Sequence, residues 1–140
     1  FALEYEGDFD EGNFHGQGRL KIIEDNDEYE GGFVEGRKHG HGKFCYGNGD
    51  VYQGNYNNDM REDENCQIHL AGGSTYIGGI KGNQFSGRGT LTRSNGDYYE
   101  GYFLDGKKSG KGILKMGAAI YEGEFKEDMK NGKGKIIFNN

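Results

Sequence analysis

The sequence predicts an all-β protein, built as an elongated, twisted, single-layer ribbon of six stacked antiparallel β-hairpins. Three observations lead to this prediction. Glycine accounts for 28 of the 140 residues and only 32% are hydrophobic, so aliphatic side chains are too scarce to fill one large core. Aromatic residues make up 14%, which argues against a disordered linker. Tyrosine and glycine also recur at a short, regular spacing along the whole chain, as in repeat architectures.

The first strand of each unit carries a tyrosine, a glycine two positions later and an apolar residue four positions later. This alternation with period two is typical of a β-strand. The tyrosines are Tyr5, Tyr29, Tyr52, Tyr76, Tyr99 and Tyr121, and the apolar residues are Phe9, Phe33, Tyr56, Ile80, Phe103 and Phe125.

A turn and a second strand complete the unit. Seven positions after each tyrosine stands Gly, Asp or Asn, and these residues tolerate positive φ, so the chain is expected to reverse there. A GxG motif with an apolar residue two positions further follows, as in Gly16, Gly18 and Leu20. Each unit therefore reads as a β-hairpin. The six units, at about residues 5–28, 29–51, 52–75, 76–98, 99–120 and 121–140, form one array, expected to be a piece of a longer chain.

The two faces of the ribbon are expected to differ. Large side chains and glycines share one face, so we expect each glycine to leave room for an aromatic ring of a neighbouring repeat. Charged side chains occupy the other face. Pairing Phe9 with Gly16 sets four pairs of opposite charge across the hairpins, which supports this register. These pairs are Glu6 with Arg19, Glu30 with Lys43, Glu122 with Lys135 and Glu124 with Lys133.

The third unit departs from the pattern because it lacks the GxG motif. Aligning it from both sides shows one additional residue between its two strands. An insertion of one residue turns a strand's inner face outward unless a longer turn or a bulge absorbs it. The sequence therefore predicts a widened loop or bulge within residues 58–66, with a local change of twist.

The segments YEGDFDEGNFHGQGRL (residues 5–20) and YEGGFVEGRKHGHGKF (residues 29–44) resemble MORN repeats, the membrane occupation and recognition nexus repeats. The resemblance extends over essentially the whole chain. It implies a non-catalytic scaffold or protein-interaction module of a cytoskeletal, ciliary or membrane-proximal assembly. Protein partners in a large assembly or a homo-oligomer, and a cytoplasmic location at the cytoskeleton, cilium or axoneme, are the corresponding expectations.

No catalytic residue, cofactor site, metal site or small-molecule substrate is predicted. His15 and His39 share one repeat position, which favours hydrogen bonding at a hairpin end over catalysis. The acidic runs lack the ligand spacing of an EF-hand loop, and no GxG motif opens a helix. Cys45 and Cys66 match no metal-binding spacing and are expected to be free thiols.

Three sets of residues are candidates for contact with partners. Aromatic residues of the inner face are expected to anchor a peptide lying in a groove: Tyr5, Phe9, Tyr29, Phe33, Tyr52, Tyr56, Tyr76, Tyr99, Phe103, Tyr121 and Phe125. Apolar residues of the outer face, Ile77, Tyr102, Leu104, Ile113 and Ile137, are expected to gather in one area. Four outer-face lysines, Lys111, Lys115, Lys133 and Lys135, are candidates for anionic lipid.

Two alternatives to a protein scaffold stay open. The first is a peripheral module that binds anionic phospholipid, because residues 1–70 carry a charge of 6 − 16 = −10 and residues 71–140 one of 11 − 7 = +4. The second is the regulatory segment of an enzyme whose catalytic domain lies elsewhere. The net charge of −6 argues against nucleic acid as a partner, and no stretch approaches the roughly 20 apolar residues of a membrane span.

Overall fold

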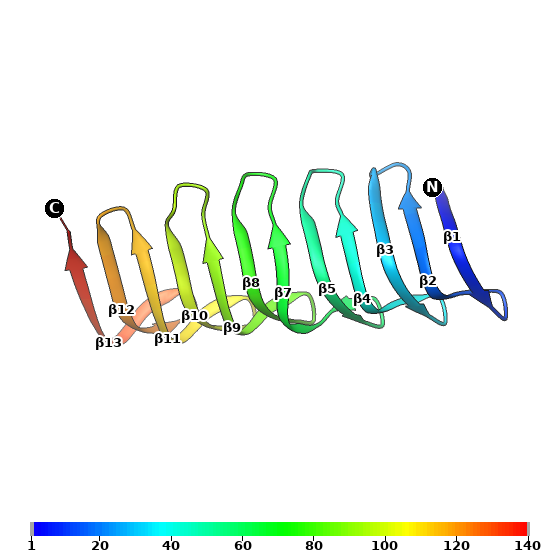
Figure 1. The fold of residues 1–140 in the computed structure, drawn as a ribbon. Helices are drawn as coiled ribbons and strands as arrows, with labels where there is room; N and C mark the ends of the chain where they lie inside the picture. The colour runs from blue at the N-terminus through cyan, green and yellow to red at the C-terminus, as the bar shows by residue number, and fades with distance from the viewer. Residues whose placement is uncertain (1, 140) are drawn as a thin grey trace.

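The computed structural model describes residues 2–139 and shows one antiparallel sheet drawn out into a ribbon (Figure 1). Its strands are β1 (Leu3–Asp10), β2 (Asn13–Ile22), β3 (Asp27–Val34), β4 (Arg37–Cys45), β5 (Val51–Asn57), β6 (Met60–Arg61), β7 (Asp63–His69), β8 (Thr75–Lys81), β9 (Gln84–Thr92), β10 (Tyr98–Leu104), β11 (Lys107–Met116), β12 (Ala119–Lys126) and β13 (Met129–Phe138). Neighbouring strands of the sheet follow one another in chain order. The short β6 is the exception, because it pairs only with β5, and β7 is the next strand of the sheet after β5. Residues 2–139 contain no helix, so the predicted all-β ribbon is confirmed.

Each hairpin closes through a two-residue turn in which both residues have positive φ. Asp105 and Gly106 form the turn between β10 and β11, with φ of 51° and 80°. Asn58 and Asp59 form the corresponding turn of the third repeat, with φ of 48° and 71°. Turns of this kind match the right-handed twist of the strands that they connect. The predicted reversal seven positions after each tyrosine is therefore confirmed.

The strand register is the same in all six repeats, because each repeat tyrosine pairs with the apolar residue of the second strand. The pairs are Tyr5 with Leu20, Tyr29 with Phe44, Tyr52 with Ile68, Tyr76 with Leu91, Tyr99 with Leu114 and Tyr121 with Ile136. Three of the predicted charge pairs face each other as expected: Glu6 with Arg19, Glu30 with Lys43 and Glu122 with Lys135. In the first repeat, however, the Arg19 guanidinium forms its ion pairs with Glu28 and Glu30 of the next repeat.

The predicted pairing of Phe9 with Gly16 is wrong, because a bulge interrupts each regular hairpin. In the first repeat the register shifts after Gly7, so Phe9 pairs with Phe14 instead. The equivalent shift in the last repeat follows Gly123, and it removes the predicted pair of Glu124 with Lys133. There the Lys133 main-chain amide donates a hydrogen bond to Glu124 Oε2 at 3.0 Å.

The two glycines of the GxG motif have different structural roles. Gly110 lies in the bulge with a φ of 71°, a left-handed backbone that glycine adopts without strain. Gly112 has no such requirement, but a Cβ placed on it would lie 2.6 Å from the Tyr99 ring. Tyr99 belongs to the same hairpin, so the prediction that these glycines accommodate a neighbouring repeat's ring is wrong. The strands bend at the glycines, which brings each tyrosine over its own hairpin.

The additional residue of the third repeat lies in the bulge and not in the turn. Four residues, 62–65, connect Arg61 to Cys66. Only three residues, 39–41, connect the equivalent positions of the second repeat. The Asp63 carboxylate fills this bulge and accepts hydrogen bonds from the amides of Asn55 (2.8 Å) and Asn65 (2.9 Å). The predicted bulge is confirmed, and the predicted widening of the loop is wrong.

Candidate functional site

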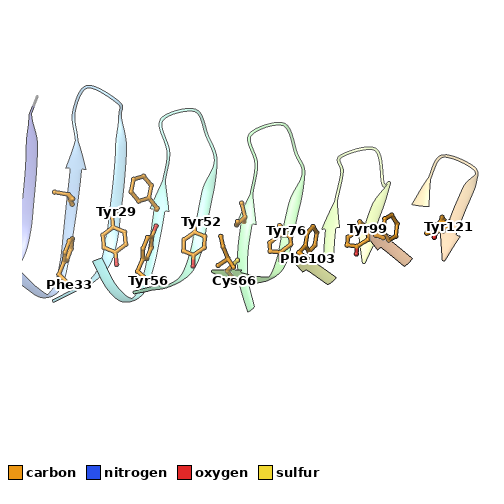
Figure 2. Close-up of a cluster of buried hydrophobic side chains, with 14 residues drawn as sticks. Tyr29, Phe33, Tyr52, Tyr56, Cys66, Tyr76, Tyr99, Phe103 and Tyr121 are labelled. Carbon is orange, nitrogen blue, oxygen red and sulfur yellow. The ribbon is translucent and has the colours of Figure 1, made fainter. Parts of the chain in front are cut away.

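The inner face of the ribbon is a continuous core. Nine of the eleven aromatic groove candidates are buried, namely Tyr29, Phe33, Tyr52, Tyr56, Tyr76, Tyr99, Phe103, Tyr121 and Phe125 (Figure 2). The other two lie at the N-terminal end, where Tyr5 is half-buried and Phe9 is 61% exposed. The role of these aromatic residues in the structure is therefore packing, and a peptide reaches nine of them only if the core opens.

Edge-to-face contacts link the rings from one repeat to the next. Phe33 packs against Tyr29 of its own repeat at 5.2 Å and against Tyr5 of the preceding repeat at 5.3 Å, measured between ring centroids. Phe125 contacts Tyr121 and Tyr99 in the same way. Such geometry is the favoured one for aromatic pairs. Phe9 is exposed because no preceding tyrosine lies beside it in the described chain.

The hydroxyl group of each repeat tyrosine also stabilises the bend of its own hairpin. The hydroxyl donates a hydrogen bond to the carbonyl three residues later, over distances of 2.6 to 2.9 Å. The pairs are Tyr5 with Asp8, Tyr29 with Gly32, Tyr52 with Asn55, Tyr76 with Gly79, Tyr99 with Tyr102 and Tyr121 with Glu124. Phenylalanine at these positions would leave the carbonyl without this partner.

The residue nine positions after each tyrosine covers the tyrosine ring, a role that the sequence analysis missed. Phe14 and Phe85 stack on Tyr5 and Tyr76, with centroids 3.8 Å apart. The other four repeats use a cation 5.4 to 5.7 Å from the ring centroid, a cation–π distance. These are Lys38 on Tyr29, Arg61 on Tyr52, Lys108 on Tyr99 and Lys130 on Tyr121.

The type of the covering residue correlates with the type of residue in the turn of the following repeat. Phe14 and Phe85 accept a main-chain hydrogen bond from a turn glycine, Gly36 and Gly106 respectively. Where the covering residue is a cation, the turn residue is Asp or Asn, and its side chain accepts a hydrogen bond from the cation's main-chain amide: Asp59 for Lys38, Asn83 for Arg61 and Asp128 for Lys108. The sequence contains this signal as a correlation between adjacent repeats.

The outer face carries a groove along the line of paired glycines in the last repeats. Its volume is about 680 Å³, and it crosses β9 to β13. Tyr102 and Ile113 supply its apolar surface, while Lys111, Lys133 and Glu122 are among the charged residues at its sides. The Tyr102 side chain is 46% exposed, and the Arg88 guanidinium lies 5.5 Å from its ring centroid.

The structure brings together two of the five outer-face apolar candidates. Tyr102 and Ile113 line this groove, whereas Ile77, Leu104 and Ile137 do not. Leu104 lies at the hairpin end beside its partner Lys107, and Ile137 faces Ile120 near the opposite end of the strands. The expectation that all five gather in one area is therefore wrong, because the strand register separates them along the sheet.

The four lipid candidates each lie near a carboxylate. Lys111 lies opposite Glu124 on the neighbouring strand, and Lys135 lies opposite Glu122. The Lys115 ammonium lies 3.9 Å from Asp97, and Lys133 contacts Glu124 through its amide. The alternation of charges reduces the positive potential that this face presents to an anionic surface.

Burial keeps the inner-face hydroxyls and the Cys66 thiol protonated. It raises the pKa of Tyr29 to about 12, and it raises the pKa values of Tyr52, Tyr56 and Tyr76 further above their usual value of 10. Burial also raises the pKa of Cys66 to about 11, which suppresses the nucleophilic thiolate. Cys45 and Cys66 are both free thiols, as predicted.

The remaining chemistry-bearing residues form no cluster among the described residues. The His39 Nδ1 atom accepts a hydrogen bond from the Asn58 amide at 3.4 Å, which confirms its role at a hairpin end. Residues 2–139 contain no group of three or more His, Cys, Asp or Glu side chains arranged to hold a metal ion. Within the same range no helix has the length and apolar character needed to cross a membrane.

Comparison with known proteins agrees with this geometry. The family model of the MORN repeat matches residues 5–22, 29–51, 76–98, 99–116 and 121–140. The unmatched stretch in the middle is the third repeat, in which the bulge carries an additional residue and Cys66 takes the place of the second glycine. No curated protein matches the chain. Because the matches cover most of its length and fall on the regular hairpins, the chain belongs to the MORN-repeat family.

Proposed function

We propose that this array is a non-catalytic interaction module that binds a protein partner in the outer groove of its last repeats. The observation that carries the proposal is an apolar surface, made by the exposed Tyr102 and the half-buried Ile113, within a groove whose sides carry both positive and negative charges. Aromatic residues in such surroundings are typical anchors of protein interfaces. The inner aromatic face is already occupied by its own packing, so this groove is the better docking surface.

A protein partner suits the groove better than a membrane does. Lys111 and Lys133 share the groove with Glu122 and Glu124, so an anionic surface meets both attraction and repulsion. A peptide can present charges of both signs in register with these side chains. We propose that the partner belongs to a cytoplasmic assembly of the cytoskeleton or cilium, where a rod-like array holds components at fixed spacing.

Photo-crosslinking tests this proposal. A photoreactive phenylalanine analogue at position 102 should capture a partner in cells, and the captured protein is then purified for binding measurements. The variants Tyr102→Ser and Ile113→Ser should each weaken its binding about tenfold or more, as expected for anchor residues. Ile77→Ser is the control, because Ile77 is an outer-face residue outside the groove and its side chain is about as exposed as that of Tyr102. Equal affinity of all three variants would contradict the proposed groove.

Sedimentation with anionic vesicles tests the lipid alternative in parallel. Replacing Lys111, Lys115, Lys133 and Lys135 by Gln should leave protein binding within about threefold, because the apolar anchors are retained. Salt-sensitive vesicle binding by the unmodified protein that disappears in this variant would favour the lipid module instead.

A further inference from the structure

The inner face contains a hollow between the second and third repeats that the proposed function does not use. Its volume is about 290 Å³. Among its lining residues are Lys38, Phe44, Tyr46, Tyr56, Asp59 and Arg61. Apolar rings and charged groups therefore meet around one hollow of the inner face.

The Tyr56 hydroxyl is the first feature that sets this hollow apart. Tyr56 occupies the position held by Phe or Ile in every other repeat, and its ring lies between those of Tyr29 and Tyr52 (Figure 2). Its side chain is 5% exposed, and its hydroxyl has no hydrogen-bond partner among the described residues. Burying a hydroxyl without a partner is unfavourable, so a packing role would be better served by Phe.

A second hydroxyl group belongs to the same hollow. Tyr46 follows Phe44 by two positions, and its ring lies 4.3 Å from that of Phe44. The corresponding residues of the other repeats are Ile22, Leu70, Arg93, Met116 and Phe138. Burial, and after it the neighbouring Tyr46 phenol, raises the pKa of Tyr56, so its hydroxyl remains a donor over the physiological range.

The fifth and sixth repeats provide an internal comparison. Lys108, Asp128 and Lys130 reproduce the charges of Lys38, Asp59 and Arg61. The two hydroxyl-bearing positions, however, are occupied there by Met116 and Phe125. The charges therefore belong to the general junction between repeats, whereas the two hydroxyls are particular to this hollow.

The charges of the hollow define the ligand that it suits. The Lys38 ammonium lies 3.6 Å from the Asp59 carboxylate and 5.6 to 5.9 Å from the rings of Phe44 and Tyr56. The Arg61 guanidinium donates its hydrogen bonds to Asn83, which is neutral. Two cations and one carboxylate leave a charge of +1, which matches a monoanion, and the rings provide a surface for an apolar group.

We propose that this hollow binds a small carboxylate with an apolar body, which accepts a hydrogen bond from Tyr56 and is paired with Lys38. Phe44 and Tyr46 contact the apolar part of the ligand. Free organic acids and the C-terminal carboxylate of a peptide ending in an apolar residue share this chemistry. A dianion such as phosphate fits less well, because Asp59 repels its second charge.

An NMR titration of the whole 140-residue chain with sodium benzoate tests the proposal. Saturable shifts should appear at the amides around the hollow, including those of Lys38, Asp59 and Arg61. Tyr56→Phe should weaken benzoate binding about tenfold, because a hydrogen bond to a carboxylate is lost. Lys38→Met should weaken it at least as much, while Lys108→Met, the matched change in the fifth repeat, should leave the affinity unchanged.

Thermal melting without ligand provides a readout that separates binding from folding. Tyr56→Phe should raise the melting temperature, because it removes a buried hydroxyl that has no partner. A lower melting temperature would show that the hydroxyl has a structural partner, and it would overturn the proposal.

Two further ligands test whether a carboxylate is required and whether the natural ligand is a free acid or a peptide terminus. N-acetyl-Gly-Phe with a free carboxylate should bind if the source is a peptide terminus, and benzoate alone should bind if the source is a free acid. The C-terminal amide of the same peptide should not bind. Equal binding of the amide, equal binding of sulfate, or equal benzoate affinity of the protein and Tyr56→Phe would each overturn the proposal.

Discussion

The hairpin of the fifth repeat, β10 and β11, and that of the third repeat, β5 to β7, reach the same register by different means. In the fifth repeat, Gly110 adopts positive φ in the bulge and Gly112 leaves room beneath Tyr99. In the third repeat, one additional residue lengthens the bulge, and no residue from 60 to 66 has positive φ. Tyr52 nevertheless pairs with Ile68 as Tyr99 pairs with Leu114.

This difference shows which part of the repeat is indispensable. The tyrosine, its hydrogen bond to the carbonyl three residues later and the two-residue turn are present in both hairpins. The GxG motif is one of two ways to build the bulge of the hairpin. An additional residue, with the Asp63 carboxylate bound to the free amides, is the other.

The largest effect is expected from filling the space under a repeat tyrosine. A Cβ at Gly89 would overlap the Tyr76 ring, so Gly89→Val should lower the free energy of unfolding by about 3 kcal/mol or more. Arg88→Val, one residue earlier on the outer face, removes an exposed contact with Tyr102 and should change it by about 1 kcal/mol or less. Chemical denaturation measures both values. Equal losses would contradict the assignment of the two faces.

Alkaline pH should destabilise the array through its buried tyrosines. The pKa of Tyr29 is about 12 in the folded chain and 10 in the unfolded chain. Its contribution to stability is therefore complete below pH 10 and is lost as the pH rises from 10 to 12. A shift of two units corresponds to about 3 kcal/mol for this residue. Unfolding followed by circular dichroism against pH should show the loss, whereas constant stability up to pH 12 would contradict it.

Replacing the first glycine of the GxG motif should cause a smaller loss of stability. The loss should differ between the hairpins of the fifth and third repeats. Gly110→Ala introduces a Cβ at positive φ with ample space around it, so the cost should be about 1 to 2 kcal/mol from backbone strain. Glu64→Ala in the bulge of the third repeat should cost about 0.5 kcal/mol or less, because no positive φ is needed there. Thermal melting of the two variants compares them directly, and similar losses would refute two distinct bulge designs.

The smallest effect is expected at a junction between repeats. Asp128→Gly keeps the positive φ of this turn position without strain, removes the acceptor of the Lys108 amide and an exposed ion pair, and should cost about 0.5 to 1 kcal/mol. Glu122→Ala, an exposed residue of the same hairpin, is the control and should be close to neutral. Urea denaturation measures the difference. No loss in Asp128→Gly would mean that the matched junctions contribute nothing to stability.

The repeat pattern along the chain is sufficient to predict the period, the strand pairs and the turns. These features depend on local rules: alternation of side chains along a strand, and the tolerance of Gly, Asp and Asn for positive φ. Six repetitions made the rules unambiguous, so the register of Tyr5 with Leu20 and its five equivalents was predictable. The interruption of the third repeat was predictable too, because counting from either side shows the additional residue near Cys66.

The places where the strands bend, and the burial of the aromatic residues that follows from the bend, depend on contacts that form in the folded chain. The bulge after Gly7 separates Phe9 from Gly16, and it folds each tyrosine over the glycine of its own hairpin. Nine aromatic residues expected to bind a peptide thereby became core, and the groove at Tyr102 and Ile113 lies on the opposite face. Side-chain alternation specifies which face a residue occupies, whereas burial depends on what the bend brings against that face.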